Sequence, residues 1–493
     1  MKLKIKALDF SSGGPFVAVL NIKDSNNLDL HPSDRIKIKY GQKELVSVLD
    51  ITENNKTVKP GEIGLFDEII KTIGRKKGYV NIHLSERLTS LAYIKKKLGG
   101  KKLRKNEINE IIKDIINNNL NEVELTYFVS ACYSNKLTLG ETLSLTKAIV
   151  EKGNRIELKK YPVLDKHCTG GVAGNRTSMI IVPILAAFGL TIPKTSSRAI
   201  SSASGTSDTM EVLAKVDFSL KRLKYIINKT NACMVWGGGF NIASADDKLI
   251  RVRNPLSLDP EGLLLSSIMA KKQAVSATHV LIDIPIGKDT KVETMKTARR
   301  LKRNFIKIGK KLRIKVKVIF TDGSQPIGNG IGPALEARDV LKVLNNQGPK
   351  DLRDKSVEMA GILLSMVGIK KGKKKALEIL KSGQAYKKMK EIIKSQGGNP
   401  NITPEKIKVG KYSHIIRTKK SGTIHSINNK EIAKIARMAG SPVDKGAGIY
   451  LWVHVRDKVK KGGKLFTLYS ENKTRLKYAL ELHEAKDPIT IIR

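Results

Sequence analysis

Residues 165–211 read DKHCTGGVAGNRTS (165–178), MIIVPILAAFGL (179–190) and TIPKTSSRAISSASGTSDTME (191–211). The first segment and the end of the third are polar and rich in glycine and hydroxyl side chains, whereas the middle segment is apolar throughout. An apolar run of this length between turn-forming segments predicts one buried helix. The sequence therefore places two polar loops on either side of a helix in the core.

The first polar loop contains Gly170, Gly171 and Gly174 and leads directly into the apolar run. Glycines let the backbone take positive φ and bring several N–H groups close to an anion, to which the start of a helix adds its dipole. Lys166 and His167, just upstream, can add charge or a hydrogen bond. Neither GxxxxGK[ST] nor GxGxxG is present, so the loop indicates an anion site of another kind or a ligand-free glycine turn.

The second polar loop favours the anion site. Eight of the fourteen residues 196–209 carry hydroxyl groups, and Arg198 stands among them while Asp208 is the only acid. Hydroxyls donate hydrogen bonds to phosphate oxygens while staying neutral, and arginine adds a charged fork. Although Ser/Thr-rich surface loops are common, two such loops flanking one helix predict a phosphate site.

A third candidate segment is RVRNPLSLDPEGLLLSSIMAKK (251–272). Asp259 precedes Pro260 at the start of an expected helix, where it can act either in chemistry or as an N-cap. Ser267 and Lys271 are four residues apart on one helical face, so both can reach the same ligand.

The charge of the chain points to anionic partners. The 493 residues include 91 Lys and Arg against 46 Asp and Glu, which gives a formal net charge of +45 and a pI near 10.0. Nucleic acid, a membrane surface and anionic small molecules are all consistent with this charge. Because the basic residues are spread over the whole chain, a solvated lysine-rich surface explains them equally, and nucleic-acid binding stays an alternative function.

The cysteines and the apolar runs indicate a cytoplasmic protein without a membrane span. Cys132, Cys168 and Cys233 are widely separated, which leaves neither a disulfide framework nor a zinc-finger spacing and suits a reducing compartment. The first residues alternate between basic and apolar like a strand, unlike a signal peptide. No apolar run reaches the ~18 residues that a bilayer requires.

The periodicity predicts an α/β multidomain chain with four parts. Residues 1–84 form a β-rich, barrel-like module; residues 85–153 are helical, with Ser85 as an N-cap and a capping box at TLGE (138–141). Residues 154–395 alternate short buried strands, such as VLIDI (280–284) and KVKVIF (315–320), with helices, as in an α/β phosphate-binding and catalytic domain. QGGNPNITP (396–404) is the expected linker to an α+β domain at 405–493.

Three motifs resemble the thymidine and pyrimidine-nucleoside phosphorylases. SSRAISSASGTSDTME (196–211) follows that family's signature S-[GS]-R-[GA]-x-x-x-[TA]-[GA]-G-T-x-D-x-x-E, with Ser204 at a position where the family has Gly or Ala. DKHCTGG (165–171) is similar to the family's DKHSTGG, and SSIMAKK (266–272) resembles its base-site helix. The resemblance covers roughly residues 85–493. Together with the N-terminal module and LDPEG (258–262), it indicates the archaeal branch that uses nucleotides.

The resemblance implies phosphorolysis of nucleoside 5′-monophosphates, AMP first and CMP or UMP as further substrates, to ribose 1,5-bisphosphate and free base. Asp259 is then the proton donor to the base, which requires burial or a neighbouring acid to raise its pKa. Inorganic phosphate is a co-substrate, and no cofactor or metal is implied. We expect a homodimer or larger homo-oligomer. The substrate-binding residues that the resemblance implies are Gly171, Ser197, Arg198, Ala199, Ile200, Ser201, Ser202, Thr206, Ser267 and Lys291.

Two other activities remain open. A thymidine or pyrimidine-nucleoside phosphorylase would arrange His167, Arg253, Ser267 and Lys271 around a pyrimidine, but Ile250 stands where those enzymes carry a tyrosine. A phosphoribosyltransferase also needs a phosphate-binding loop, although it uses pyrophosphate on an activated ribose.

Overall fold

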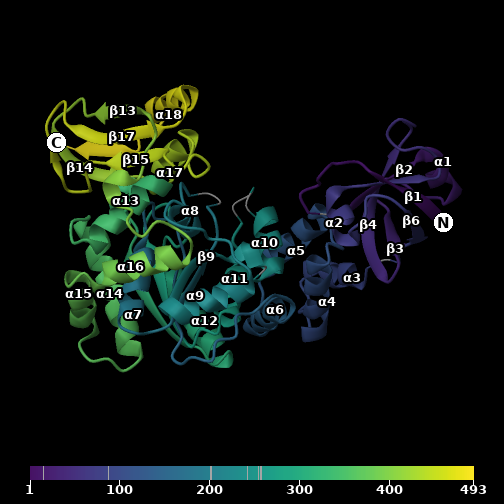
Figure 1. Cartoon of the computed structure of the whole chain (residues 1–493), viewed down its shortest axis with the longest axis horizontal. Coiled ribbons are helices and arrows are strands. Elements are labelled where there is room, and N and C mark those ends of the chain that lie inside the picture. Colours follow the sequence, from purple (N-terminus) through teal and green to yellow (C-terminus); the bar gives the residue numbers. More distant parts are fainter. Residues whose placement is uncertain are drawn as a thin grey trace. The chain divides into compact units, whose positions relative to one another are not determined.

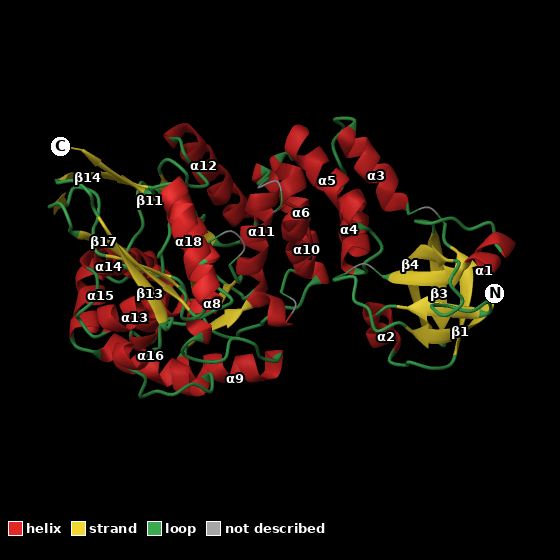
Figure 2. Ribbon diagram, turned by 90° about the horizontal axis from the view of Figure 1, so that it is seen from above, coloured by secondary structure: helices red, strands yellow, loops and turns green. Residues whose placement is uncertain are grey.

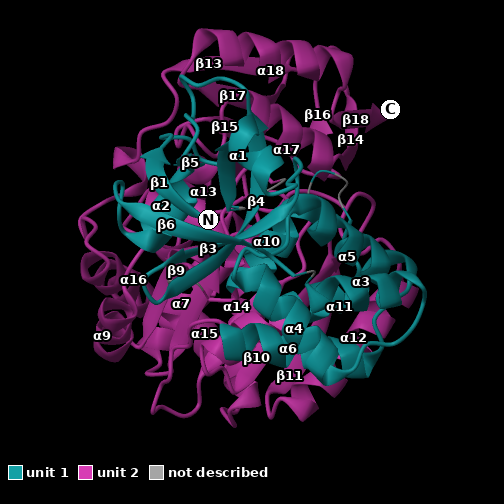
Figure 3. Ribbon diagram, turned by 90° about the vertical axis from the view of Figure 1, so that its right-hand side faces the viewer, with its two compact units in different colours: residues 1–152, 244–267 teal, residues 153–243, 268–493 magenta. Residues whose placement is uncertain are grey.

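The structure is a computed structural model that describes residues 1–14, 16–86, 88–199, 202–240, 242–253, 255 and 258–492. Its contacts divide the chain into two compact units (Figure 3). Unit 1 comprises residues 1–152 and 244–267, and unit 2 comprises residues 153–243 and 268–493. Residues 244–267 thus group with the helical segment, whereas our continuous ranges assign them to the α/β domain. The four domain boundaries stay a prediction.

The N-terminal module of unit 1 is a closed barrel (Figures 1 and 2). Its strands follow the order β1-β5-β2-β4-β3-β6, and in β3 (RIKIKY, 35–40) the buried Ile36 and Ile38 alternate with more exposed basic residues. The strands and the two short helices beside them are β1 (Lys2–Ala7), β2 (Val17–Asn21), α1 (Ile22–Asn27), β3 (Arg35–Tyr40), β4 (Lys43–Thr52), β5 (Glu62–Leu65), α2 (Asp67–Ile73) and β6 (Tyr79–Leu84).

The rest of unit 1 is helical. Its helices are α3 (Thr89–Leu98), α4 (Lys105–Ile116), α5 (Glu122–Ser134), α6 (Leu139–Lys152), α10 (Ser244–Arg253) and the start of α11 (Glu261–Ala274). The predicted capping box is present, since Glu141 N donates to Thr138 Oγ1 and Thr138 N donates to Glu141 Oε2. The predicted N-cap at Ser85 is wrong, because α3 begins at Thr89 and Leu88 occupies its N-cap position.

The centre of unit 2 is a parallel sheet. Its strands are β7 (Leu164–Cys168), β8 (Ile192–Ser196), β9 (Ala232–Trp236), β10 (His279–Ile286) and β11 (Lys315–Asp322). Strands pair in the order β11-β10-β7, strand β8 pairs with β9, and a bridge between Val163 and Thr191 joins the two groups. The chain therefore moves outward from β7 to β9 and then returns to β10 on the other side of β7. This reversal makes a topological switch point between β7 and β10.

The predicted buried helix is α7 (Thr177–Ala187), every residue of which is buried apart from the last. It packs in one apolar core with α14 and α16 (Figure 1). The helices of the α/β part of unit 2 are α7, α8 (Thr206–Glu211), α9 (Leu220–Thr230), the 3₁₀ turn η1 (Gly237–Phe240), α11 from residue 268, α12 (Met295–Lys311), α13 (Pro333–Leu344), α14 (Lys350–Met366), α15 (Gly372–Lys381) and α16 (Gln384–Ser395).

The C-terminal part of unit 2 is α+β, with its own apolar core. The first residue of the expected linker, Gln396, is fully buried against the α/β part. Its Oε1 accepts a hydrogen bond from Met234 N in β9, and its Nε2 donates one to Met234 O. Besides the turn η2 (Pro404–Lys406), the elements of this part are β12 (Gly330–Ile331), β13 (Tyr412–Arg417), β14 (Gly422–Ile427), α17 (Asn429–Met438), β15 (Gly448–Leu451), β16 (Lys458–Val459), β17 (Lys464–Ser470), α18 (Lys473–Ala485) and β18 (Ile489–Ile492).

Candidate active site

The first polar loop lies at the switch point, directly against the loop that follows β10. Gly171 has φ +95°, and a Cβ there would lie 2.6 Å from Thr290 Cα and 2.8 Å from Lys291 N. A Cβ on Gly170 would lie 3.8 Å from Lys291 Cε. Gly171 therefore has to be glycine both for its backbone angle and for its contact with the neighbouring loop. The structure brings Gly171 and Lys291 together, two of the residues that the sequence selected.

The second polar loop is shaped by Asp208. One carboxylate oxygen, Oδ2, accepts hydrogen bonds from Ala199 N at 2.6 Å and Gly205 N at 2.8 Å, and the side chain is buried. Two backbone segments of the loop are thus fixed by one acid. Ser202 Oγ donates to Ser204 O at 3.0 Å, which closes the loop further. The predicted binding residues Ile200 and Ser201 lie outside the described residues.

Arg198 points its charged fork at an acid of its own loop. Its Nη1 and Nη2 donate to Glu211 at 2.7 and 2.6 Å, and its guanidinium lies 5.0 Å from the ring centre of Trp236. Lys445 of the C-terminal domain also reaches Glu211, at 2.7 Å. The hydrogen bond from Arg198, with a further one from Lys445, lowers the pKa of Glu211 to about 2. A contact between Arg198 and phosphate stays a prediction.

Arg176, at the entrance of α7, connects the two loops. Its Nη1 donates to Thr206 Oγ1 at 3.1 Å and its Nη2 to Ser204 O at 2.8 Å. Its Nε lies 2.6 Å from Glu336 Oε2, and that carboxylate also accepts from Thr209 Oγ1 at 2.7 Å. Our sequence analysis missed Arg176. The position of this arginine directly before Thr177 and Ser178 could have marked it as a candidate binding residue, but only the fold shows which groups it contacts.

Beneath the loops lies a layer of buried charge. Lys272 Nζ lies 2.6 Å and Lys194 Nζ 3.7 Å from the carboxylate of Asp165. On β10, Asp283 lies 3.7 Å from Lys166 Nζ and 3.5 Å from the Nζ of Lys355 in α14. Four lysines thus share two aspartates on β7 and β10, so basic side chains outnumber acidic ones in this buried group.

Burial changes the protonation chemistry of this layer. It lowers the pKa of Lys194 to about 7, an effect that the neighbouring Lys272 increases. Burial, together with Lys272 and Lys194, also holds the pKa of His167 well below its ordinary value, so the imidazole is neutral. Burial raises the pKa of the Cys168 thiol. At neutral pH His167 and Cys168 therefore act as uncharged hydrogen-bonding groups.

Two threonine hydroxyls at the strand ends lack partners. Thr169 Oγ1 follows β7 and Thr195 Oγ1 lies near the end of β8; both are buried, and neither has a hydrogen-bond partner among the described residues. Buried hydroxyls are nearly always hydrogen-bonded in proteins. Their position at the carboxyl ends of adjacent strands fits a ligand with oxygen acceptors.

The base-side candidates lie in unit 1. Asp259 precedes α11 with 36% of its side chain exposed, and its Oδ1 lies 3.8 Å from Arg253 Nη1. The role of Asp259 as proton donor, which requires burial or a neighbouring acid, stays a prediction. Ser267 Oγ donates to Asp246 Oδ2 of α10 at 2.6 Å and is buried.

Family models match three successive parts of the chain. They are described as the glycosyl transferase family helical bundle domain (residues 91–153), the glycosyl transferase family a/b domain (160–386) and the pyrimidine nucleoside phosphorylase C-terminal domain (423–490).

Curated relatives match the whole chain. The AMP phosphorylase of Thermococcus kodakarensis is 46% identical over 100% of this chain and 98% of its own length. Those of Pyrococcus abyssi and Thermofilum pendens are 47% and 42% identical over 100% of this chain and 98% and 96% of theirs.

The chain belongs to the AMP phosphorylase family. The resemblance that we drew from the three motifs is thereby confirmed, as are a pentosyltransferase-type phosphorylase and the α/β multidomain layout. A solved structure supports the fold alone: anthranilate phosphoribosyltransferase (TrpD) from Thermus thermophilus aligns with a TM-score of 0.52 at 18% identity. That alignment covers 62% of this chain and 98% of the other.

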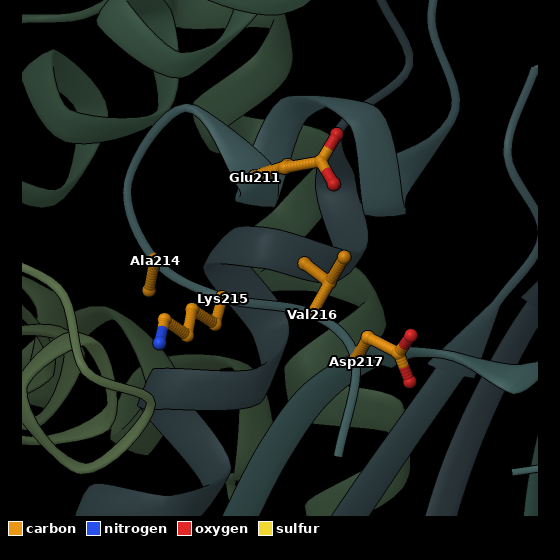
Figure 4. Close-up of a pocket in the computed structure, with 5 residues that line it drawn as sticks. All are labelled: Glu211, Ala214, Lys215, Val216 and Asp217. Atoms are coloured by element: carbon orange, nitrogen blue, oxygen red, sulfur yellow. The ribbon is translucent and has the colours of Figure 1, made fainter. Parts of the chain in front are cut away.

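One pocket in this AMP phosphorylase family member lies at the C-terminal end of α8. It is lined by Glu211, Ala214, Lys215, Val216 and Asp217 (Figure 4). Among the described residues, His, Cys, Asp and Glu side chains form no group of three that could hold a metal ion. In the same part of the chain, no helix has both the length and the apolar character needed to cross a bilayer.

Proposed function

We propose that this chain catalyses phosphorolysis of nucleoside 5′-monophosphates, with AMP as the first substrate and CMP and UMP as further ones. The products are ribose 1,5-bisphosphate and the free base. One observation carries the proposal: relatives named AMP phosphorylase match the chain over its whole length, including the barrel module that precedes the family models.

The geometry of unit 2 supports binding of inorganic phosphate between the two polar loops. The glycine loop and the Asp208-shaped loop follow adjacent strands, β7 and β8, and Arg176 joins them. The unpartnered hydroxyls of Thr169 and Thr195 lie at the ends of the same strands. Preorganised donors of this kind hold a nucleophile in place and cost little reorganisation during the reaction.

In the proposed reaction a phosphate oxygen forms a bond to C1′ of the ribose while the bond from C1′ to the base nitrogen breaks. The electron pair of that bond goes to the base, which takes a proton from Asp259 as it leaves. For this step Asp259 has to be protonated, whereas 36% of its side chain is exposed before substrate binds. We therefore expect bound substrate to cover this carboxyl.

The remaining assignments follow from family membership. Contacts to the nucleotide and phosphate are assigned to Gly171, Ser197, Arg198, Ala199, Ile200, Ser201, Ser202, Thr206, Ser267 and Lys291. The reaction needs no cofactor, because phosphate is itself the co-substrate. We also propose a cytoplasmic homodimer or larger homo-oligomer, in which the N-terminal barrel is a separate module.

The test is product analysis. The full chain is incubated with inorganic phosphate and either AMP or thymidine, and free base and ribose 1,5-bisphosphate are quantified by chromatography. We expect adenine and ribose 1,5-bisphosphate in equal amounts from AMP. Base release from thymidine without release from AMP would identify a pyrimidine-nucleoside phosphorylase instead. Salt-sensitive binding of nucleic acid without either activity would favour the nucleic-acid-binding alternative.

A further inference from the structure

We propose that Arg176 is a positioning residue that directs the proton of the Thr206 hydroxyl toward the phosphate. The inference rests on the proposed function, in which Thr206 contacts the nucleotide or phosphate. It adds a residue that lies outside the family signature at 196–211 and acts on that signature from the first loop.

The argument starts from the donors of Arg176. Its Nη1 lies 3.1 Å from Thr206 Oγ1. A guanidinium has N–H donors and no acceptor, so in this contact the threonine oxygen has to accept. A hydroxyl carries a single proton, which therefore has to point away from Arg176. Among the described residues, no carbonyl or carboxylate accepts that proton.

Other hydroxyls of the same loop use their protons within the protein. Ser202 Oγ donates to Ser204 O at 3.0 Å, and Ser204 Oγ donates to Gly205 O at 3.2 Å. In this arrangement neither side chain has a proton left to donate to a phosphate oxygen, so Ser202 can contact the nucleotide only as a hydrogen-bond acceptor. Thr206 differs, because its oxygen accepts from Arg176 and its proton points outward. This proton can be donated to a phosphate oxygen.

Arg176 is itself held in place from three directions. Its Nη2 donates to Ser204 O at 2.8 Å, and its Nε lies 2.6 Å from Glu336 of α13. Only 10% of the Arg176 side chain and 1% of the Glu336 side chain are exposed. Because its two Nη atoms donate hydrogen bonds and its Nε forms an ion pair with Glu336, the guanidinium cannot rotate without losing a contact. The direction of the Thr206 hydroxyl is thus built into the fold before any ligand binds.

The experiment is a double-mutant cycle on inorganic phosphate binding, measured by isothermal titration calorimetry on the full chain. Thr206→Val removes the hydroxyl at nearly constant volume, and Arg176→Lys keeps the charge beside Glu336 but loses the fork. We expect each change alone to weaken phosphate binding by about 10-fold, since a hydrogen bond to a charged group is lost. In the Thr206→Val background, Arg176→Lys should change the Kd by less than about 2-fold, because Arg176 acts through that hydroxyl.

Multiplication of the two losses to about 100-fold would overturn the proposal, as would wild-type phosphate affinity in Arg176→Lys. The matched control is Arg338→Lys on α13, whose side chain donates to Ile407 O away from both loops and whose loss should leave the Kd unchanged. If circular dichroism shows that Arg176→Lys does not fold, the paired Arg176→Met/Glu336→Met variant replaces it, since it leaves no buried charge unpaired.

This test and the test of the proposed function fail in different ways. A wild type that binds phosphate with the expected coupling but releases no adenine from AMP refutes the proposed function and supports the role of Arg176. An active enzyme without the coupling refutes the role of Arg176 alone. A wild type that does not bind phosphate contradicts both.

Discussion

The two polar loops of unit 2 and the Asp259 segment of unit 1 differ in how deeply their key carboxylate, Asp208 or Asp259, is buried. In the loops, Asp208 fixes the backbone at Ala199 and Gly205 with bonds of 2.6 and 2.8 Å, and its side chain is buried. Asp259, by contrast, has 36% of its side chain exposed, and its Oδ1 lies 3.8 Å from Arg253 Nη1.

This difference separates two catalytic tasks. Holding a phosphate requires several donors at fixed positions, and a protein can arrange those in advance. A carboxylic acid that donates a proton near neutral pH requires shielding from water, which the base itself can supply. We therefore expect changes in the loops to act on the KM for phosphate and changes at Asp259 to act on kcat.

The largest expected effect is that of Asp259→Asn. An amide cannot deliver the proton to the leaving base, so kcat for adenine release should fall by a factor on the order of 100 or more, while the KM for phosphate changes little. The neighbouring Glu261→Gln is the matched control and should retain wild-type kcat. Full activity of Asp259→Asn in a steady-state assay would remove Asp259 from the acid role.

The next effect is that of Gly171→Ala. The new Cβ would lie 2.6 Å from Thr290 Cα, so the glycine loop or the β10 loop has to move, and kcat/KM for phosphate should fall about 10- to 100-fold. Gly189→Ala is a close control, because its φ of +85° carries the same backbone strain with no atom within 4 Å of the added Cβ. Equal losses in both variants would assign the effect to strain rather than to the contact between loops.

A smaller effect is expected from Lys445→Met, which tests whether the C-terminal domain supports the second loop. Lys445 lies 2.7 Å from Glu211, the residue that holds Arg198, and is 36% exposed. A partly exposed ion pair is worth at most about 1 kcal/mol, so we expect the KM for phosphate to rise roughly 5-fold or less. Lys434→Met removes the exposed pair with Glu431 and should have no effect. A change in kcat alone would contradict a role in shaping the loop.

The last prediction concerns stability and Lys194. Burial lowers its pKa in the folded chain to about 7, against about 10.4 in the unfolded chain. Between these values the unfolded chain binds more protons, so this residue makes the free energy of unfolding rise with pH. In urea titrations, the difference between wild type and Lys194→Met should shift in favour of the wild type by at least about 1 kcal/mol from pH 7 to 9. The exposed Lys215→Met should show no such shift, and a flat difference for Lys194→Met would contradict the lowered pKa.

Much of the proposed phosphate site, formed by the two polar loops, could be predicted from local sequence patterns. Glycines, hydroxyls and the apolar run at 165–211 predicted the loops and the helix between them, because turn formation and helix burial depend on nearby residues. The same patterns could not show that Arg198 would bond Glu211 or that Gln396 would dock on β9. Those contacts depend on where distant segments meet.

The sequence by itself determined the family, the elements around the switch point, and the residue types able to hold phosphate. Only the tertiary structure decided that Gly171 packs against Thr290, that Arg176 sets the polarity of Thr206, and that Asp259 lies at the surface. The physical reason is that propensity and periodicity act over a few residues. Burial, charge pairing and hydrogen-bond direction, in contrast, are set by groups that are far apart along the chain and meet only in the fold.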